Sequence, residues 1–157
     1  MNRISNLERK YVLEALDNEF RTSLNSVFVS RLEQQFAEKF NCSFAISHVN
    51  GTSTMHTALA ALGVGVCDEV IVPPLTMTST ALSVLHNQSI PVFADVEPLS
   101  YCINHEQIEE LISDKTVAIV APNLMGNICQ WDQIRYLADK YNKIPIVNFK
   151  GSNKLVI

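Results

Sequence analysis

The sequence contains no apolar run near the roughly 20 residues that a membrane-spanning helix needs, so no such helix is expected. Positive charge is also scarce, because 12 scattered Lys and Arg residues stand against 16 Asp and Glu residues. This balance argues against a nucleic-acid-binding face. The first residues, MNRISNLERK, are too polar for a secretory signal peptide, so none is expected. With 47% hydrophobic and 18% charged residues, the chain is predicted to be globular and soluble.

Cysteines at metal-binding or redox spacing are missing as well. The four cysteines, Cys42, Cys67, Cys102 and Cys129, lie far apart, with no CxxC pair and no His at ligand spacing. This distribution is typical of reduced thiols in a cytoplasmic protein. The sequence therefore predicts no metal site.

What the chain does contain is an alternation of short apolar runs and helical runs. Two helices are expected first, over Leu7–Phe20 and Val27–Phe40, from apolar residues at helical spacing. Apolar strands separated by helices indicate an α/β fold, a mostly parallel sheet covered on both faces. The expected strands are Phe44–Ser47, Glu69–Val72, Ile90–Ala94, Val117–Ala121 and Ile144–Val147, and the expected helices between them are Thr54–Leu62, Thr78–His86, Glu106–Ile112 and Trp131–Tyr141.

The most informative segment is SHVNGTSTMHTALAALGVG, between Ser47 and Gly65. A helix that opens directly after the turn at Gly51 leaves its first amide N–H groups unpaired at the positive end of its dipole. Gly51 lets a ligand approach the backbone, and the hydroxyls of Thr52, Ser53 and Thr54 add donors. Such a junction suits a phosphate or a carboxylate. An ordinary capped helix after a glycine turn is the alternative.

Several ordered segments together resemble the DegT/DnrJ/EryC1/StrS aminotransferases, which are sugar aminotransferases that depend on pyridoxal 5'-phosphate. The segments are NGTSTMHTALAALGVGVCDEVIVPPLTMTSTALSVL, IPVFADVEPLSYCI, KTVAIVAPNLMGN and IPIV. The resemblance implies a three-layer sandwich, the large domain of the type I (aspartate aminotransferase) fold. It assigns residues 1–147 to the N-terminal part of that domain and leaves 148–157 as an unrelated tail.

The resemblance also implies cofactor contacts at five positions. Gly51, Thr52 and Ser53 match the turn that holds the cofactor phosphate. Met77 stands where many relatives place an aromatic ring over the pyridine face, although it equally suits a core-facing side chain. Asn123 stands where relatives often carry His, and the neighbouring Met125 replaces a Tyr.

Two catalytic groups of the family are not matched, so no catalytic residue is predicted. The carboxylate that keeps the pyridine nitrogen protonated should follow the fifth strand, but Phe149 takes its place. The Schiff-base lysine lies further along the family sequence, and neither Lys150 nor Lys154 matches it. We interpret the chain as truncated before that lysine, and a frameshift or a premature stop would produce this pattern.

The family sheet order, 3-2-4-5-6-7-1, places the first strand beside the seventh. Without strands six and seven, Phe44–Ser47 has no neighbour and the edge of strand five is open. We therefore expect poor solubility or partial disorder when the chain is expressed alone.

Three functions remain open. The chain is part of an aminotransferase that transfers an amino group from glutamate to a nucleotide-linked keto-sugar, for surface polysaccharide or deoxyamino-sugar biosynthesis, in a homodimer. Alternatively, it is a non-catalytic remnant or binding module, which better explains Phe149. A fragment of a related sugar dehydratase is the third possibility.

Overall fold

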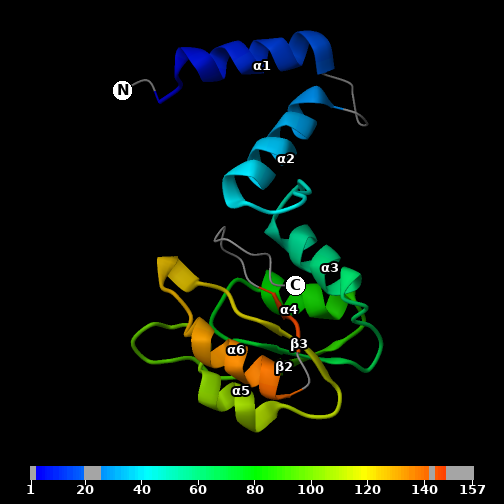
Figure 1. Ribbon diagram of the computed structural model, residues 1–157, viewed down its shortest axis with the longest axis vertical. Coiled ribbons are helices and arrows are strands. Elements are labelled where there is room, and N and C mark those ends of the chain that lie inside the picture. Colours follow the sequence, from blue (N-terminus) through cyan, green and yellow to red (C-terminus); the bar gives the residue numbers. More distant parts are fainter. Residues whose placement is uncertain (1–2, 20–25, 142–143, 148–157) are drawn as a thin grey trace. The chain divides into compact units, whose positions relative to one another are not determined.

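The computed structural model describes residues 3–19, 26–141 and 144–147, which form two compact units, Met1–Ser47 and His48–Ile157 (Figure 1). The expected tail 148–157, with Phe149, Lys150 and Lys154, lies outside the described residues. Each unit is described by itself below.

The first unit contains two helices, α1 (Asn6–Glu19) and α2 (Val27–Phe40). Helix α1 begins with a capping box, because the Ser5 N–H donates to the Glu8 carboxylate and the Glu8 N–H donates to Ser5 Oγ. Helix α2 is capped by Ser26, whose side chain accepts from the Val29 N–H at 3.2 Å. Both expected helices are thus confirmed over their described residues.

The expected strand Phe44–Ser47 is wrong. The segment is irregular, and the side chains of Phe44 and Ile46 are 84% and 74% exposed. Among the described residues no strand pairs with it, and the N–H and hydroxyl of Ser47 donate instead to Glu33 Oε1 at 2.8 and 2.9 Å. An apolar run forms a strand only where a neighbouring strand takes up its backbone groups.

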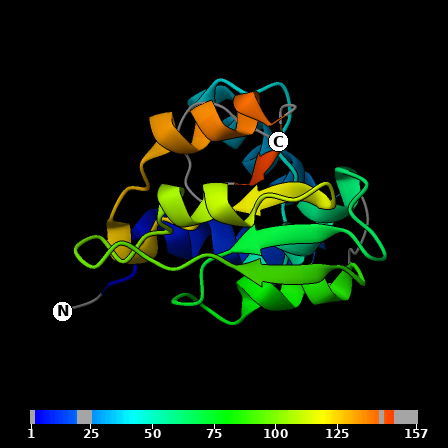
Figure 2. The ribbon, with the colours of Figure 1, turned by 90° about the horizontal axis from the view of Figure 1, so that it is seen from below.

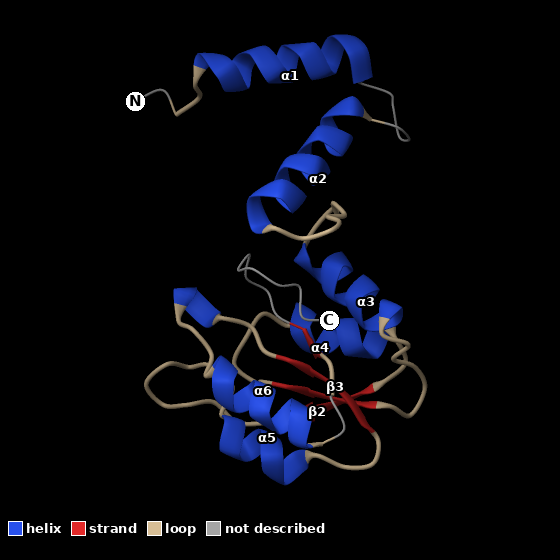
Figure 3. Cartoon of the chain, viewed as in Figure 1, coloured by secondary structure: helices blue, strands red, loops and turns tan. Residues whose placement is uncertain are grey.

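The second unit is built on a four-stranded parallel sheet in the order β2-β1-β3-β4 (Figure 3). This is the 3-2-4-5 part of the order that the family resemblance implies. The expected and observed ends of the strands differ by at most two residues. The strands are β1 (Glu69–Val72), β2 (Ile90–Phe93), β3 (Thr116–Val120) and β4 (Ile146–Val147).

Helices cover both faces of the sheet, as expected, and give three layers (Figure 2). Successive side chains of a strand point to opposite faces of the sheet. Val70 and Val72 therefore pack with one pair of helices, whereas Ile71 packs with the other pair. Each fully buried side chain of this size contributes about 1.5–3 kcal/mol. The helices are α3 (Gly51–Ala61) and α4 (Ser79–His86) on the first face, and α5 (His105–Leu111) and α6 (Trp131–Lys140) on the second.

Strand β2 forms one edge of this sheet and carries a proline. The Ile90 N–H donates to the carbonyl of Asp68, just before β1, and the Ala94 N–H donates to the carbonyl of Val72, the last residue of β1. Because backbone groups alternate in direction along a parallel strand, Pro91 and Phe93 turn theirs away from β1. Pro91, at one of these outward positions, has no N–H to offer.

Candidate functional site

The N-terminus of α3 is set by Asn50. Its backbone is extended (φ −165°, ψ 173°), and its side-chain oxygen accepts from the Ser53 N–H at 2.9 Å. An asparagine in this position satisfies one of the amides that a helix start leaves unpaired. The helix consequently begins at Gly51, three residues before the expected start at Thr54.

Two backbone amides at this helix start remain available. The N–H groups of Gly51 and Thr52 donate to no other described residue. A Cβ placed on Gly51 would meet no atom within 4 Å, and the φ of Gly51 is not positive. Neither backbone conformation nor packing therefore requires glycine here, and the missing side chain leaves the backbone open to the approach of a ligand. These features fit a phosphate group.

The hydroxyl groups around the turn are not equivalent. Ser53 Oγ donates to the Asn50 carbonyl at 2.9 Å, and Thr54 Oγ1 donates to the same carbonyl at 3.1 Å. The hydroxyl of Thr52, by contrast, bonds to no other residue in the described part of the chain. Within the described ranges Gly51 and Thr52 thus keep donors without a partner, whereas the Ser53 hydroxyl already bonds to Asn50.

The helix start lies at the carboxyl edge of the sheet. Helix α3 leads through the short connection 62–68 into β1, and its residues Met55 and Leu59 pack on the sheet. It must therefore run antiparallel to β1, with its N-terminus toward the strand's carboxyl end. In open α/β sheets ligands bind at this edge.

Met77 lies in the connection that leaves the carboxyl end of β1, two residues before α4 begins at Ser79. Its side chain is 74% exposed. The alternative that Met77 faces the core is therefore wrong, and the residue stands in a connection at the edge where the ligand is expected.

Asn123 follows β3 at the same edge and is half-buried. Its side-chain oxygen accepts from the Cys129 N–H at 2.8 Å and closes a loop that contains the short 3₁₀ turn η1 (Leu124–Gly126). Met125 within this turn has a left-handed backbone (φ 52°) and is 89% exposed. Asn123 thus shapes the loop that carries Met125, a positioning contact that the sequence did not reveal.

Cys102 and Cys129 are buried together in the core on the α5–α6 face. Burial, with Cys102 beside it, raises the pKa of the Cys129 thiol to about 12. A thiol with such a pKa is a poor nucleophile at neutral pH. Among the described residues no cluster of three metal-ligating side chains occurs, and no helix is long and apolar enough to cross a bilayer.

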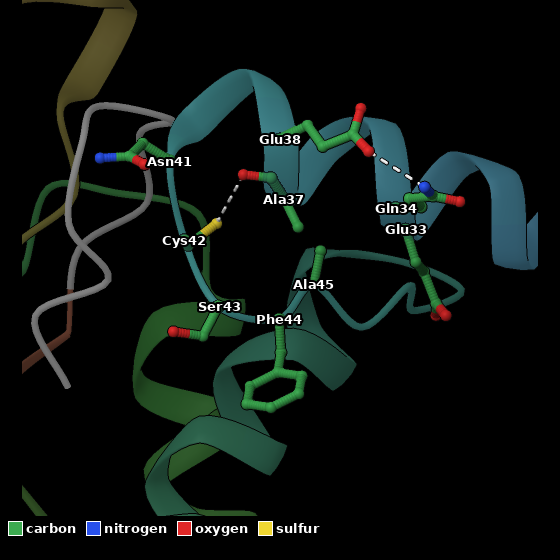
Figure 4. Close-up of a pocket in the computed structure, with 9 residues that line it drawn as sticks. All are labelled: Glu33, Gln34, Ala37, Glu38, Asn41, Cys42, Ser43, Phe44 and Ala45. Atoms are coloured by element: carbon green, nitrogen blue, oxygen red, sulfur yellow. Dashed lines mark hydrogen bonds between the residues drawn. The ribbon is translucent and has the colours of Figure 1, made fainter.

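The predicted site residues all belong to the second unit. A separate hollow lies within the first unit, between the end of α2 and the segment that follows it (Figure 4). Glu33 and Glu38 line it from the helix, and Phe44 lines it from the following segment. None of the five predicted cofactor contacts takes part in this hollow.

Comparison with known proteins agrees with the fold. The model of the DegT/DnrJ/EryC1/StrS aminotransferase family matches residues 2–148. The GDP-perosamine synthase of Caulobacter vibrioides is 38% identical over 144 residues, which cover 92% of this chain and 38% of the relative. The UDP-2-acetamido-2-deoxy-3-oxo-D-glucuronate aminotransferase of Pseudomonas aeruginosa is 35% identical over 119 residues, 76% of this chain and 33% of the relative.

Solved structures show the same likeness. An aminotransferase from Psychrobacter cryohalolentis is 33% identical and matches with a TM-score of 0.86, over 94% of this chain and 37% of that one. NtdA of Bacillus subtilis, solved with the bound cofactor PMP, is 27% identical with a TM-score of 0.83, over 92% of this chain and 34% of that one. The chain spans 38% of the length of the GDP-perosamine synthase that it matches. With its parallel sheet in the expected order and a family match over nearly all its residues, the chain belongs to the DegT/DnrJ/EryC1/StrS aminotransferase family.

Proposed function

We propose that this chain forms the phosphate-anchoring part of a pyridoxal 5'-phosphate-dependent aminotransferase that acts on nucleotide-linked keto-sugars. The observation that carries the proposal is the pair of amides at Gly51 and Thr52, at the carboxyl edge of the sheet, which donate to no other residue that the structure describes. The names of relatives support the substrate class, since both a GDP-sugar and a UDP-sugar enzyme are among them.

In this proposal each part of the edge has a physical task. The amides of Gly51 and Thr52 and the Thr52 hydroxyl bind the phosphate, assisted by the positive end of the α3 dipole. Met77 covers one face of the pyridine ring and keeps water from it. Asn123 holds the loop after β3, and through it Met125, at the rim of the site. The bound cofactor would supply an electron sink for amino-group transfer.

Glutamate as the amino donor, a homodimeric assembly and a cytoplasmic location belong to the same proposal. The free state of the four cysteines is compatible with a reducing compartment. The products of such a reaction would enter surface polysaccharide or deoxyamino-sugar biosynthesis.

A second candidate is a binding module that holds the phosphate without transferring an amino group. Phe149, in place of the family's carboxylate, favours it, because a phenyl group cannot keep a pyridine nitrogen protonated. Both candidates require the same phosphate anchor. They differ in whether amino transfer follows binding, so the anchor is the feature to test first.

The test compares Gly51→Ala with Gly65→Ala. Both glycines have room for a methyl group, since a Cβ on Gly65 would come no closer than 4.0 Å to the Gly63 carbonyl. We expect Gly51→Ala to weaken binding of pyridoxal 5'-phosphate by at least about tenfold, because its methyl group occupies the phosphate cradle. Gly65→Ala should bind normally.

Binding is measured by titration of the ¹⁵N-labelled full chain, in which the amide signals of Gly51 and Thr52 should shift first. Pyridoxal, which lacks the phosphate, should shift them little. Equal binding of the two ligands, or equal affinity of the two glycine variants, would overturn the assigned anchor. Amino transfer from glutamate, followed separately by 2-oxoglutarate release, distinguishes the two candidates.

A further inference from the structure

Two histidines that lie 30 residues apart in the sequence meet between α3 and α4. The ring centroids of His56 and His86 are 5.4 Å apart, with an angle of 64° between the ring planes. His56 is half-buried and His86, the last residue of α4, is exposed. Both rings are therefore accessible to a small solute.

The helices are held together at these two residues. Asn87, directly after His86, donates from its side-chain amide to the His56 carbonyl at 3.2 Å and to the Ser83 carbonyl at 2.9 Å. Below this contact, Leu59 of α3 and Val84 of α4 are fully buried in one core cluster. The distance between the two imidazoles is thus set by the surrounding structure rather than by the flexible side chains alone.

We propose that His56 and His86 form a two-imidazole binding site for a divalent first-row transition metal ion of the Ni²⁺ or Zn²⁺ class. Imidazole nitrogen is a preferred ligand for these ions. When two imidazoles bind one ion at about 2.1 Å, their centroids lie roughly 5 Å apart for the tetrahedral angle of Zn²⁺ and somewhat closer for the right angle that Ni²⁺ prefers. The observed 5.4 Å between the two rings is close to the Zn²⁺ spacing.

Binding requires one nitrogen of each ring to turn toward a common point. Rotation about the Cβ–Cγ bond of histidine is broad, and the exposed His86 ring is free to turn. Because the described residues hold no cluster of three ligating side chains, water completes the coordination shell. The ion is thus expected to exchange readily.

A bound ion would join α3 to α4 and so stabilise the folded state by mass action. This inference does not depend on the proposed cofactor site, since neither histidine takes part in the phosphate cradle. The proposed metal site and the proposed phosphate site can therefore be refuted independently of each other.

The experiment uses the full chain without a histidine tag and NiCl₂ as the probe. In NMR spectra of the imidazole protons, substoichiometric Ni²⁺ should broaden the signals of His56 and His86, while those of His48 and His105 remain sharp. The melting midpoint should rise by several degrees with Ni²⁺ and return with EDTA.

Variants then identify the ligands. His56→Gln and His86→Gln should each weaken Ni²⁺ binding by at least about tenfold in calorimetric titrations, whereas His48→Gln should bind as the unmodified chain does. Cys67→Ser is a second control, because Cys67 is an exposed thiol. The NMR readout needs no variant and so remains valid if one fails to fold. Broadening of only one of the two rings, unchanged affinity in both glutamine variants, or loss of binding in Cys67→Ser would overturn the proposal.

Discussion

The difference between Thr52 and Ser53 gives the sharpest test of the phosphate anchor. The Thr52 hydroxyl has no partner among the described residues, whereas Ser53 Oγ donates to the Asn50 carbonyl at 2.9 Å. A hydrogen bond to a charged group contributes about 1.5–3 kcal/mol. Thr52→Val, which preserves side-chain shape, should therefore weaken binding of pyridoxal 5'-phosphate by about 10- to 150-fold.

Ser53→Ala should change the same affinity by less than about threefold, since its hydroxyl already bonds within the helix turn, but should lower the free energy of unfolding by up to about 1 kcal/mol. Dissociation constants come from calorimetric titration of each full-length variant, with circular dichroism melts as the control for folding. The reasoning is refuted if Ser53→Ala weakens binding as much as Thr52→Val does. In that case the Ser53 hydroxyl rotates to the ligand and the arrangement of the free chain is not the binding arrangement.

Leu59→Ala should lower the free energy of unfolding by about 2–5 kcal/mol, because this side chain is fully buried, whereas Leu85→Ala, at 52% exposure, should cost much less; similar urea midpoints would contradict the assigned core. Since burial raises the pKa of Cys129 from 9.0 to about 12, the stability linked to its proton is present below pH 9 and is lost as the pH rises toward 12. Iodoacetamide at pH 8.5 should accordingly label the exposed Cys67 well before Cys129, as read by peptide mass spectrometry, and the reverse order would refute this assignment. A hydrogen bond from Lys140 lowers the pKa of Glu109 below 4.5. The small contribution of this pair to the stability of the fold is therefore present above that pH and is lost as the pH falls. An NMR titration midpoint of Glu109 at or above 4.5 would show that the pair does not form.

Local patterns predicted the regular elements of this chain well where each element carries its own signal. Helix α2 has its expected bounds, because its apolar spacing and its Ser26 cap are both local. Strand β1 also has its expected bounds. The order of the strands came from the family resemblance, since no local pattern encodes which strands become neighbours.

The failures concern contacts between distant residues. Phe44–Ser47 has the composition of a strand, but pairing depends on another segment, which no apolar run specifies. The hydrogen bond from Cys129 to Asn123 closes a loop in which Met125 has a left-handed backbone, a conformation that its residue type disfavours. The contact between His56 and His86 results from the packing of α3 against α4, and their spacing in the sequence does not predict it.

Pro91 has a consequence for how this sheet can be extended. A strand added beyond β2 would find no N–H donor at Pro91, so one carbonyl of the added strand would lack a hydrogen bond. At the opposite side, Pro145 and Val147 turn their carbonyls to β3, so the intervening Ile146 points both its amide and its carbonyl outward. An added strand would therefore meet both a donor and an acceptor at Ile146 of β4 but only an acceptor at Pro91 of β2, which disfavours edge-to-edge aggregation on the β2 side.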